Sequence, residues 1–243
     1  IENNKRIRIK GPYTRFDQEP FDEWLASQIC KRLGFDYCNY IVDWYAIEQD
    51  KVIVSKCENF INQNEEIISA YDVFQSSKKE NTINDYEHYV RILENHGILD
   101  ARKKITEMFV VDYLMMNYDR HLKNFGIIRN VETLKWEKVT PIFYTGQSMC
   151  CDEHVQNMDF THGCGKFFTD ANKDYNAILK SLDMETIRAI PIQNLKGLSE
   201  EYYVFLKSFQ KEMEYKNKEW SDERMKNLKD GLSKRIDLLK KER

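Results

Sequence analysis

Four polar residues in one short segment have the types and spacing that phosphoryl transfer requires. Asp119, Arg120, His121 and Asn124 follow an apolar stretch and precede a β-rich one. A carboxylate can accept the proton of an attacking hydroxyl, and an amide oxygen five residues later can ligate a magnesium ion that bridges ATP phosphates. The spacing alone has low specificity, because Asp-x-x-x-x-Asn also occurs at Asp112/Asn117, Asp152/Asn157 and Asp222/Asn227.

The residues around this loop predict the elements that hold it. Residues 101–117 have the apolar pattern of a helix, and a stripe of methionine and aromatic residues is more typical of a core than of a cofactor pocket. Asp112 lies on the same face, and we interpret it as a structural acceptor for the loop beyond Asn117. After the loop, residues 125–129 and 135–139 predict a hairpin.

A lysine and a glutamate near the start of the chain form a second candidate constellation. Residues 5–10 alternate polar and apolar side chains, which predicts a strand after a turn at Asn3-Asn4, and a helix pattern begins near Phe21 and closes at Gly34. Lys10 ends the strand and Glu23 lies in the first part of the helix. Such a pair orients ATP phosphates in kinases. Alternatively, Lys10 is a solvated strand end and Glu23 is a first-turn acid favoured by the helix dipole.

Two further strands are predicted at residues 37–46 and 51–55, with a turn at 48–50. Residues 56–58 then leave the predicted sheet, at a natural hinge to a helical region. From residue 65 the pattern is mostly helical, with helices expected at 86–95 and 101–117. After residue 146 the chain is again expected to be helical, with one helix beginning at 167–170.

The composition predicts a folded globular protein without a strong overall charge. Hydrophobic residues make up 42% and aromatic residues 13% of the 243 positions, and 37 basic against 40 acidic side chains give a net charge of -3. No direct nucleic-acid binding and no membrane association are expected. The six cysteines lack metal-site spacing and are interpreted as reduced thiols, which together with the absence of a signal peptide predicts a cytoplasmic location.

The ordered motifs resemble those of the HipA-like serine/threonine protein kinase family, and within it the compact CtkA-like branch of bacterial kinases. The resemblance covers nearly the whole chain. Its motifs are Ile9-Lys10-Gly11, Gln18 to Ser27, Asp112-Tyr113-Leu114, Asn117 to Gly126, Pro141-Ile142-Phe143 and Thr145-Gly146.

This resemblance implies an α+β, two-lobed protein-kinase-like fold. The small β-rich lobe would span residues 1–58, and the larger, mainly helical lobe residues 59–243, with the catalytic loop at 117–126 and the metal-motif segment at 141–146. The phosphate-binding loop expected before the first lysine strand would lie upstream of Ile1.

The resemblance also implies roles for individual residues. Asp119 would be the catalytic base and Asn124 a magnesium ligand. ATP would be held by Lys10, by Glu23 acting on Lys10, by His121 at a phosphate, and by the backbone around Lys56, Cys57 and Glu58 at the adenine. The cofactors implied are ATP and Mg²⁺.

One departure from the family pattern bears directly on activity. The family expects Phe-Asp-x-Gly where this chain has Phe143-Tyr144-Thr145-Gly146. A neutral phenol is a poor ligand for a hard cation, so its presence is expected to remove most of the phosphoryl-transfer rate even if ATP binds. Tyr144 has three interpretations: a naturally degenerate kinase, an inactivating change, or an adaptation in which another ligand such as Asp152 replaces the carboxylate.

Three functional hypotheses follow. The first is an ATP- and magnesium-dependent serine/threonine protein kinase, impaired by Tyr144, that phosphorylates a protein substrate of unknown identity. The second is a pseudokinase that acts as a nucleotide- or partner-binding module, although Lys10, Glu23, Asp119, His121 and Asn124 are all retained. The third is a structural partner in a toxin–antitoxin pair, with a small antitoxin-like protein bound to it.

Overall fold

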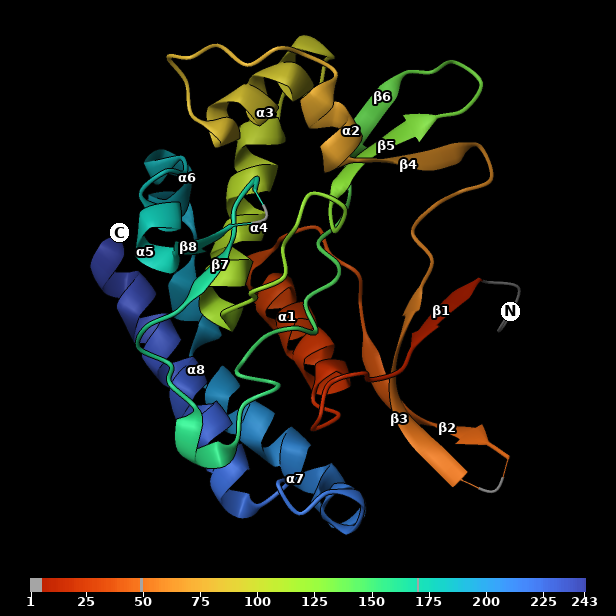
Figure 1. The fold of residues 1–243 in the computed structure, drawn as a ribbon, viewed down its shortest axis with the longest axis vertical. Coiled ribbons are helices and arrows are strands. Elements are labelled where there is room, and N and C mark those ends of the chain that lie inside the picture. The colour runs from red at the N-terminus through yellow and green to blue at the C-terminus, as the bar shows by residue number, and fades with distance from the viewer. Residues whose placement is uncertain (1–5, 49, 170) are drawn as a thin grey trace.

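The computed structural model describes residues 6–48, 50–169 and 171–243, and it has the predicted α+β fold (Figure 1). An antiparallel sheet with strand order β1-β3-β2 lies at one side of helix α1, and the larger helices lie at the other. A second sheet, β4-β5-β6, lies near α2 and α3, and a small hairpin pairs β7 with β8. The division into segments 1–58 and 59–243 stays a prediction.

The strands are β1 Ile7–Lys10, β2 Ile41–Ile47, β3 Asp50–Glu58, β4 Glu65–Ser69, β5 Gly126–Asn130, β6 Trp136–Val139, β7 Cys164–Lys166 and β8 Asn172–Asp174. The α-helices are α1 Glu19–Leu33, α2 Ala70–Gln75, α3 Asp85–Asn95, α4 Ala101–Met115, α5 Tyr175–Leu179, α6 Met184–Ala189, α7 Leu198–Lys216 and α8 Asp222–Glu242. Two short 3-10 helices span Val155–Asn157 and Ile192–Leu195.

Helix α1 connects the two parts of the molecule. Pro20 occupies its first turn, where a missing N–H costs nothing, and Gly34 ends it with a left-handed φ of 75°. The helix contacts β2 and β3 on one side and α4 and α7 on the other. Because it is covered on both sides, its buried positions include Asp22 and Glu23 as well as apolar residues.

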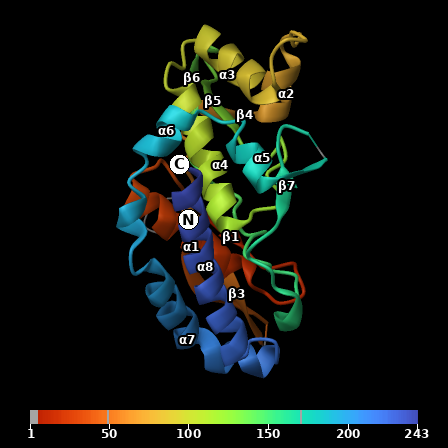
Figure 2. The same cartoon turned by 90° about the vertical axis from the view of Figure 1, so that its left-hand side faces the viewer.

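Helices α4 and α8 pack together in the helical part, as the two views of the chain show (Figures 1 and 2). The predicted apolar face of α4 belongs to the main core, and Ile105 and Leu114 are fully buried there. The helix ends at Met115, because Met116 adopts a left-handed φ of 54°. The core interpretation of this helix is therefore confirmed, and the polar loop begins where the helix stops.

Three predictions about strands were wrong in extent or in type. The strand predicted at 37–46 begins only at Ile41 and continues to Ile47 as β2. The strand predicted at 51–55 continues to Glu58, because residues 56–58 pair with β1 and Lys56 also pairs with Ile41 of β2. Residues 65–69 were expected to be helical but form β4, which pairs with β5. The predicted hairpin of 125–129 with 135–139 is confirmed as β5 and β6. The turn at Asn3-Asn4, and Gln49 within the turn at 48–50, lie outside the described residues.

The prediction that the chain is helical after residue 146 was also wrong in part. Residues 164–166 and 172–174 form the β7–β8 hairpin. No helix begins at 167–169, while Asp170 lies outside the described residues. Phe167 and Phe168 are buried against Phe109 of α4, so this aromatic pair anchors the hairpin connection in the core instead of starting a helix.

Candidate active site

A buried ion pair shapes the loop that follows α4. Arg120 donates from Nε to Asp112 Oδ2 at 2.8 Å and from a terminal nitrogen to Oδ1 at 2.9 Å. Its other terminal nitrogen donates to the backbone oxygens of Asn124 and Phe143 at 2.9 and 2.6 Å. Arg120 is 1% exposed. The Arg120 guanidinium therefore links the end of α4 to the backbone at Asn124 and at Phe143. The interpretation of Asp112 as a structural acceptor is confirmed.

Asn117 adds a second link between the same segments. Its side-chain nitrogen donates to Asp112 Oδ1 at 2.8 Å and to the backbone oxygen of Tyr144 at 3.4 Å. Its side-chain oxygen accepts from the Asp119 amide at 3.1 Å. The sequence analysis had placed Asn117 only within a motif. Its contacts show that it positions the backbone of Asp119.

The Asp119 carboxylate lies at the surface of this loop, with its side chain 27% exposed. The side-chain nitrogen of Asn124 donates to the Asp119 backbone oxygen at 2.7 Å and to Oδ2 at 3.4 Å. His121 Nε2 lies 3.8 Å from Oδ2. The structure therefore brings together three residues predicted from the sequence, and their catalytic roles stay predictions.

Lys166 is a site residue that the sequence analysis missed. It lies at the end of β7, and its Nζ donates to Asp119 Oδ1 at 2.7 Å. A single lysine in a segment expected to be helical carried no signal of this contact. The pair places a positive charge directly beside the carboxylate that could take a proton.

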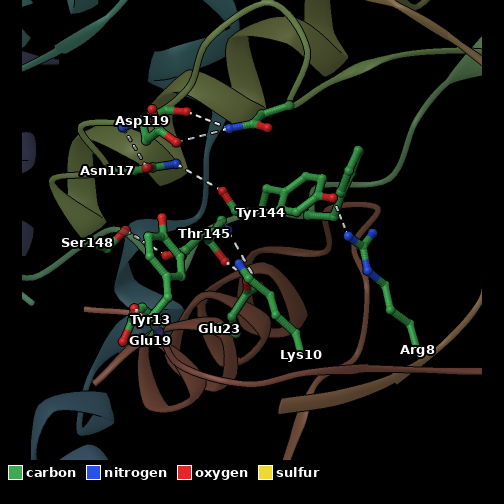
Figure 3. Close-up of polar contacts among 12 residues, drawn as sticks. Arg8, Lys10, Tyr13, Glu19, Glu23, Asn117, Asp119, Tyr144, Thr145 and Ser148 are labelled. Atoms are coloured by element: carbon green, nitrogen blue, oxygen red, sulfur yellow. Dashed lines mark hydrogen bonds and ion pairs between the residues drawn. The ribbon is translucent and has the colours of Figure 1, made fainter. Parts of the chain in front are cut away.

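Lys10 and Glu23 are in contact. Lys10 Nζ donates to Glu23 Oε1 at 2.9 Å, and Glu23 is fully buried. Thr145, which the sequence analysis placed only within a motif, donates from Oγ1 to Glu23 Oε2 at 3.2 Å. A solvated strand end and an isolated first-turn acid therefore do not describe this pair. Glu23 joins β1 to the segment that follows Tyr144 (Figure 3).

Gly146 allows that segment to lie against α1. A Cβ atom at this position would lie 2.9 Å from Glu19 Cβ and 3.3 Å from Glu23 Oε1. Glu19 itself accepts from the backbone amides of Tyr13 and Thr14 at 3.0 and 2.7 Å. Burial, with the nearby carboxylates of Asp119 and Glu19, raises the pKa of Tyr13 to about 12, so its phenol stays neutral at physiological pH.

Tyr144 faces away from the Asp119 side of the site. Its hydroxyl accepts a hydrogen bond from Arg8, and the Arg8 guanidinium carbon lies 4.4 Å from the ring centroid (Figure 3). Lys10 Nζ lies 5.0 Å from the same centroid. The φ of Tyr144 is 57°, a left-handed conformation that is uncommon for an aromatic residue and costs roughly 1–3 kcal/mol. The surrounding contacts hold the ring against two cations.

The donor set does not fit a kinase magnesium site. Asn124 donates from its side-chain nitrogen to Asp119, which leaves its amide oxygen as a potential ligand, but the neutral Tyr144 supplies no carboxylate beside it. Asp152 accepts from the backbone amide of Arg15 at 3.2 Å. Over residues 6–48, 50–169 and 171–243, no group of three or more His, Cys, Asp or Glu is arranged to hold a metal ion.

The predicted adenine segment, Lys56 to Glu58, ends strand β3 beside a cleft of about 490 Å³. Cys57 is buried in a small cluster with Cys38, Tyr40 and Phe143, and Phe60 packs against it. The volume falls in the range of small-molecule sites. The contribution of this segment to adenine binding stays a prediction.

A family model described as the HipA-like C-terminal domain matches residues 3–190. The chain belongs to this HipA-like family. The match includes the Lys10–Glu23 pair, the loop that carries Asp119 and the segment that carries Tyr144. The resemblance inferred from the sequence motifs is therefore confirmed.

The chain is also similar to a curated kinase and to a solved kinase structure. The serine/threonine-protein kinase CtkA of Helicobacter pylori (strain J99) is 23% identical over 155 residues, which cover 57% of this chain and 45% of that kinase. The crystal structure of a Helicobacter pylori proinflammatory kinase CtkA aligns with a TM-score of 0.69 and 18% identity, covering 98% of this chain and 90% of that one. The shared fold is thereby established.

A HipA from Shewanella oneidensis MR-1, solved with HipB and its operator DNA, aligns with a TM-score of 0.47 and 12% identity over 96% of this chain and 58% of that one. This similarity carries no argument about partners, so an antitoxin-like partner of this HipA-like chain stays a prediction. Within the described residues, none of the helices combines the length and the apolar character that crossing a membrane requires.

Proposed function

We propose that this chain is a kinase-fold protein that binds ATP between β1 and the Asp119 loop, and that its transfer of phosphate to a protein serine or threonine is impaired by Tyr144. The observation that carries the proposal is the Lys10–Glu23 ion pair at 2.9 Å, joined through Thr145 to the segment beside the Asp119 loop. Membership of the HipA-like family and the fold shared with CtkA support it.

The residues present suggest how the reaction would run. Lys10 would bind ATP phosphates, and Glu23 would orient its ammonium group. Asp119 would accept the proton of the substrate hydroxyl as the hydroxyl oxygen bonds to the γ-phosphorus, while the bond to the β–γ bridging oxygen breaks and ADP leaves. Asn117 and Arg120 would hold the loop in place, because their side chains fix its backbone.

Tyr144 favours a second candidate, a pseudokinase that binds nucleotide without transferring phosphate. Tyr144 occupies the position of the expected metal-binding carboxylate, and its hydroxyl accepts from Arg8 instead. The two candidates share a nucleotide site and differ in whether the remaining groups can still catalyse transfer.

Restoring the carboxylate distinguishes the two. The Tyr144→Asp variant should gain magnesium-dependent transfer of labelled phosphate from ATP to itself or to a generic protein substrate, by about a hundredfold or more if the kinase proposal is right. Tyr144→Phe is the matched control and should gain nothing. Adding Asp119→Asn to Tyr144→Asp should abolish the gain. No transfer by Tyr144→Asp, with ATP still bound, would favour the pseudokinase.

A further inference from the structure

Arg8 lies two residues before Lys10 on β1, so the two side chains share one face of the strand. Both reach the ring of Tyr144, at 4.4 Å for the Arg8 guanidinium carbon and 5.0 Å for Lys10 Nζ (Figure 3). The sequence analysis singled out Lys10 alone. The structure shows a pair of cations facing the segment where a metal site is expected.

These cations retain hydrogen-bonding capacity for an anion. Arg8 has five N–H donors, and one of its terminal nitrogens donates to Tyr144. Lys10 has three donors and uses one on Glu23. Within residues 6–48, 50–169 and 171–243, no carboxylate lies within ion-pair distance of Arg8, and its side chain donates to the neutral phenol of Tyr144.

Arg8 places a fixed positive charge beside the neutral phenol of Tyr144. In kinases, divalent cations neutralise the charge of the phosphates at this position. Arg8 can also bind phosphate oxygens through two parallel N–H groups, a geometry that suits phosphate well.

We propose that Arg8 and Lys10 form a metal-independent site for the phosphates of ATP, in which Tyr144 positions Arg8. The Tyr144 hydroxyl accepts from the Arg8 guanidinium, and the Tyr144 ring lies against it. Tyr144 is a poor metal ligand, but these contacts allow it to orient a cation. This inference rests on the proposed nucleotide binding and concerns only how the phosphates are neutralised.

The test is calorimetric titration of ATP into the whole chain, once in EDTA and once with magnesium. The unmodified chain should bind ATP in EDTA with a Kd within about threefold of the magnesium value. Arg8→Gln should weaken binding in EDTA about tenfold or more, because a charged hydrogen-bond donor is lost. Arg129→Gln, which removes an arginine that pairs with Glu66 on the second sheet, should leave the Kd unchanged.

Two further variants address Tyr144 and folding. Tyr144→Asp should make ATP binding depend on magnesium, because the new carboxylate would neutralise Arg8 and ligate the metal. Arg8→Lys keeps the charge without the bidentate geometry and should bind ATP in EDTA more weakly than the unmodified chain but more tightly than Arg8→Gln. The melting temperature of each ATP-free variant shows whether it is folded, and Arg8→Lys replaces Arg8→Gln in the comparison if the latter unfolds.

The outcomes separate this inference from the proposed function. Binding only in the presence of magnesium would overturn the metal-independent site and leave nucleotide binding intact. Equal Kd values for Arg8→Gln and the unmodified chain in EDTA would also overturn it. Binding in neither condition would overturn the proposed function, and this inference with it.

Discussion

The ammonium group of Lys166 lies 2.7 Å from Oδ1 of Asp119, although 47 positions separate the two residues. Both side chains are about one quarter exposed, so the pair stands at the surface of the site and not in the core. Lys166 belongs to β7, whose connection to β8 is anchored by buried aromatic residues. The β7–β8 hairpin therefore positions the ammonium group of Lys166 beside Asp119, the candidate base.

Replacing Lys166 should affect transfer more than stability. In the Tyr144→Asp background, Lys166→Gln should lower phosphate transfer by about tenfold or more, because the carboxylate loses the group that orients it and the site loses a charge near the transferred phosphate. The free energy of unfolding should change by less than about 1 kcal/mol, since exposed ion pairs contribute little. Transfer assays and urea denaturation measure the two quantities. An unchanged transfer rate would show that the pair is only structural.

Substituting Gly146 should damage the packing between α1 and the Tyr144 segment. The added methyl of Gly146→Ala would lie 2.9 Å from Glu19 Cβ, which is closer than carbon atoms pack. We expect a loss of about 1–3 kcal/mol in the free energy of unfolding, as for other overpacked sites. Urea denaturation measures it. Gly11→Ala is the matched control, since a Cβ there meets no atom within 4 Å, and an equal loss in both variants would contradict the packing argument.

Local patterns in the sequence predicted the elements that depend on neighbours along the chain. The helix that ends at Gly34 and the hairpin of β5 with β6 followed from short-range signals, whereas the pairing of Lys10 with Glu23 was implied by the family resemblance. Tyr144 was also recognised as a departure from the family motif. These features are encoded within a few residues, by periodicity, capping and motif spacing.

Contacts between distant segments were not predictable in the same way. Arg8 and Tyr144 are 136 positions apart, and neither residue alone indicates the other. Residues 65–69 form a strand because they pair with β5, which lies far away in the sequence. A local sequence pattern does not contain this information. The sequence predicted a helix start at Phe167 and Phe168. In the structure both rings pack against Phe109 in the core, and no helix begins with them.

The buried pair of Arg120 with Asp112 should be the most sensitive ionic contact in the loop. Arg120→Met would leave the Asp112 carboxylate, 4% exposed, without its cation, and we expect a loss of about 3–5 kcal/mol in the free energy of unfolding. The double variant Arg120→Met with Asp112→Leu should recover part of this loss, because no unpaired charge remains buried. Urea denaturation of the single and double variants measures both effects.

An exposed ion pair provides the comparison. Glu201 accepts from Arg32 at the surface, with side chains 46% and 26% exposed, so Glu201→Ala should cost less than about 1 kcal/mol. A loss for Arg120→Met as small as that for Glu201→Ala would mean that water reaches Asp112 and that the loop is not fixed by this pair.

Asp22 of α1 is fully buried and should make stability depend on pH. Its oxygens accept from Gln18 Nε2 at 3.2 and 3.0 Å and from the Tyr202 hydroxyl at 3.1 Å. Burial raises its pKa well above the ordinary 3.8, as does the nearby charge of Glu19, while the hydrogen bonds and the positive charge of Arg224 oppose that shift. The folded state therefore binds this proton more tightly than the unfolded state.

Because the folded state holds the Asp22 proton more tightly, the protein loses stability as the pH rises and this proton is released. The proton's contribution to stability is complete below about pH 4 and is lost as the pH rises through the folded pKa. Between these limits this group should lower the free energy of unfolding by up to about 1.4 kcal/mol for each pH unit. Urea denaturation from pH 5 to 8 should show a shallower decline for Asp22→Asn than for the unmodified chain. The control Asp237→Asn alters an exposed carboxyl whose pKa is lowered, so it should leave the decline unchanged. Identical pH profiles for Asp22→Asn and the unmodified chain would show that Asp22 is already ionised in the folded protein.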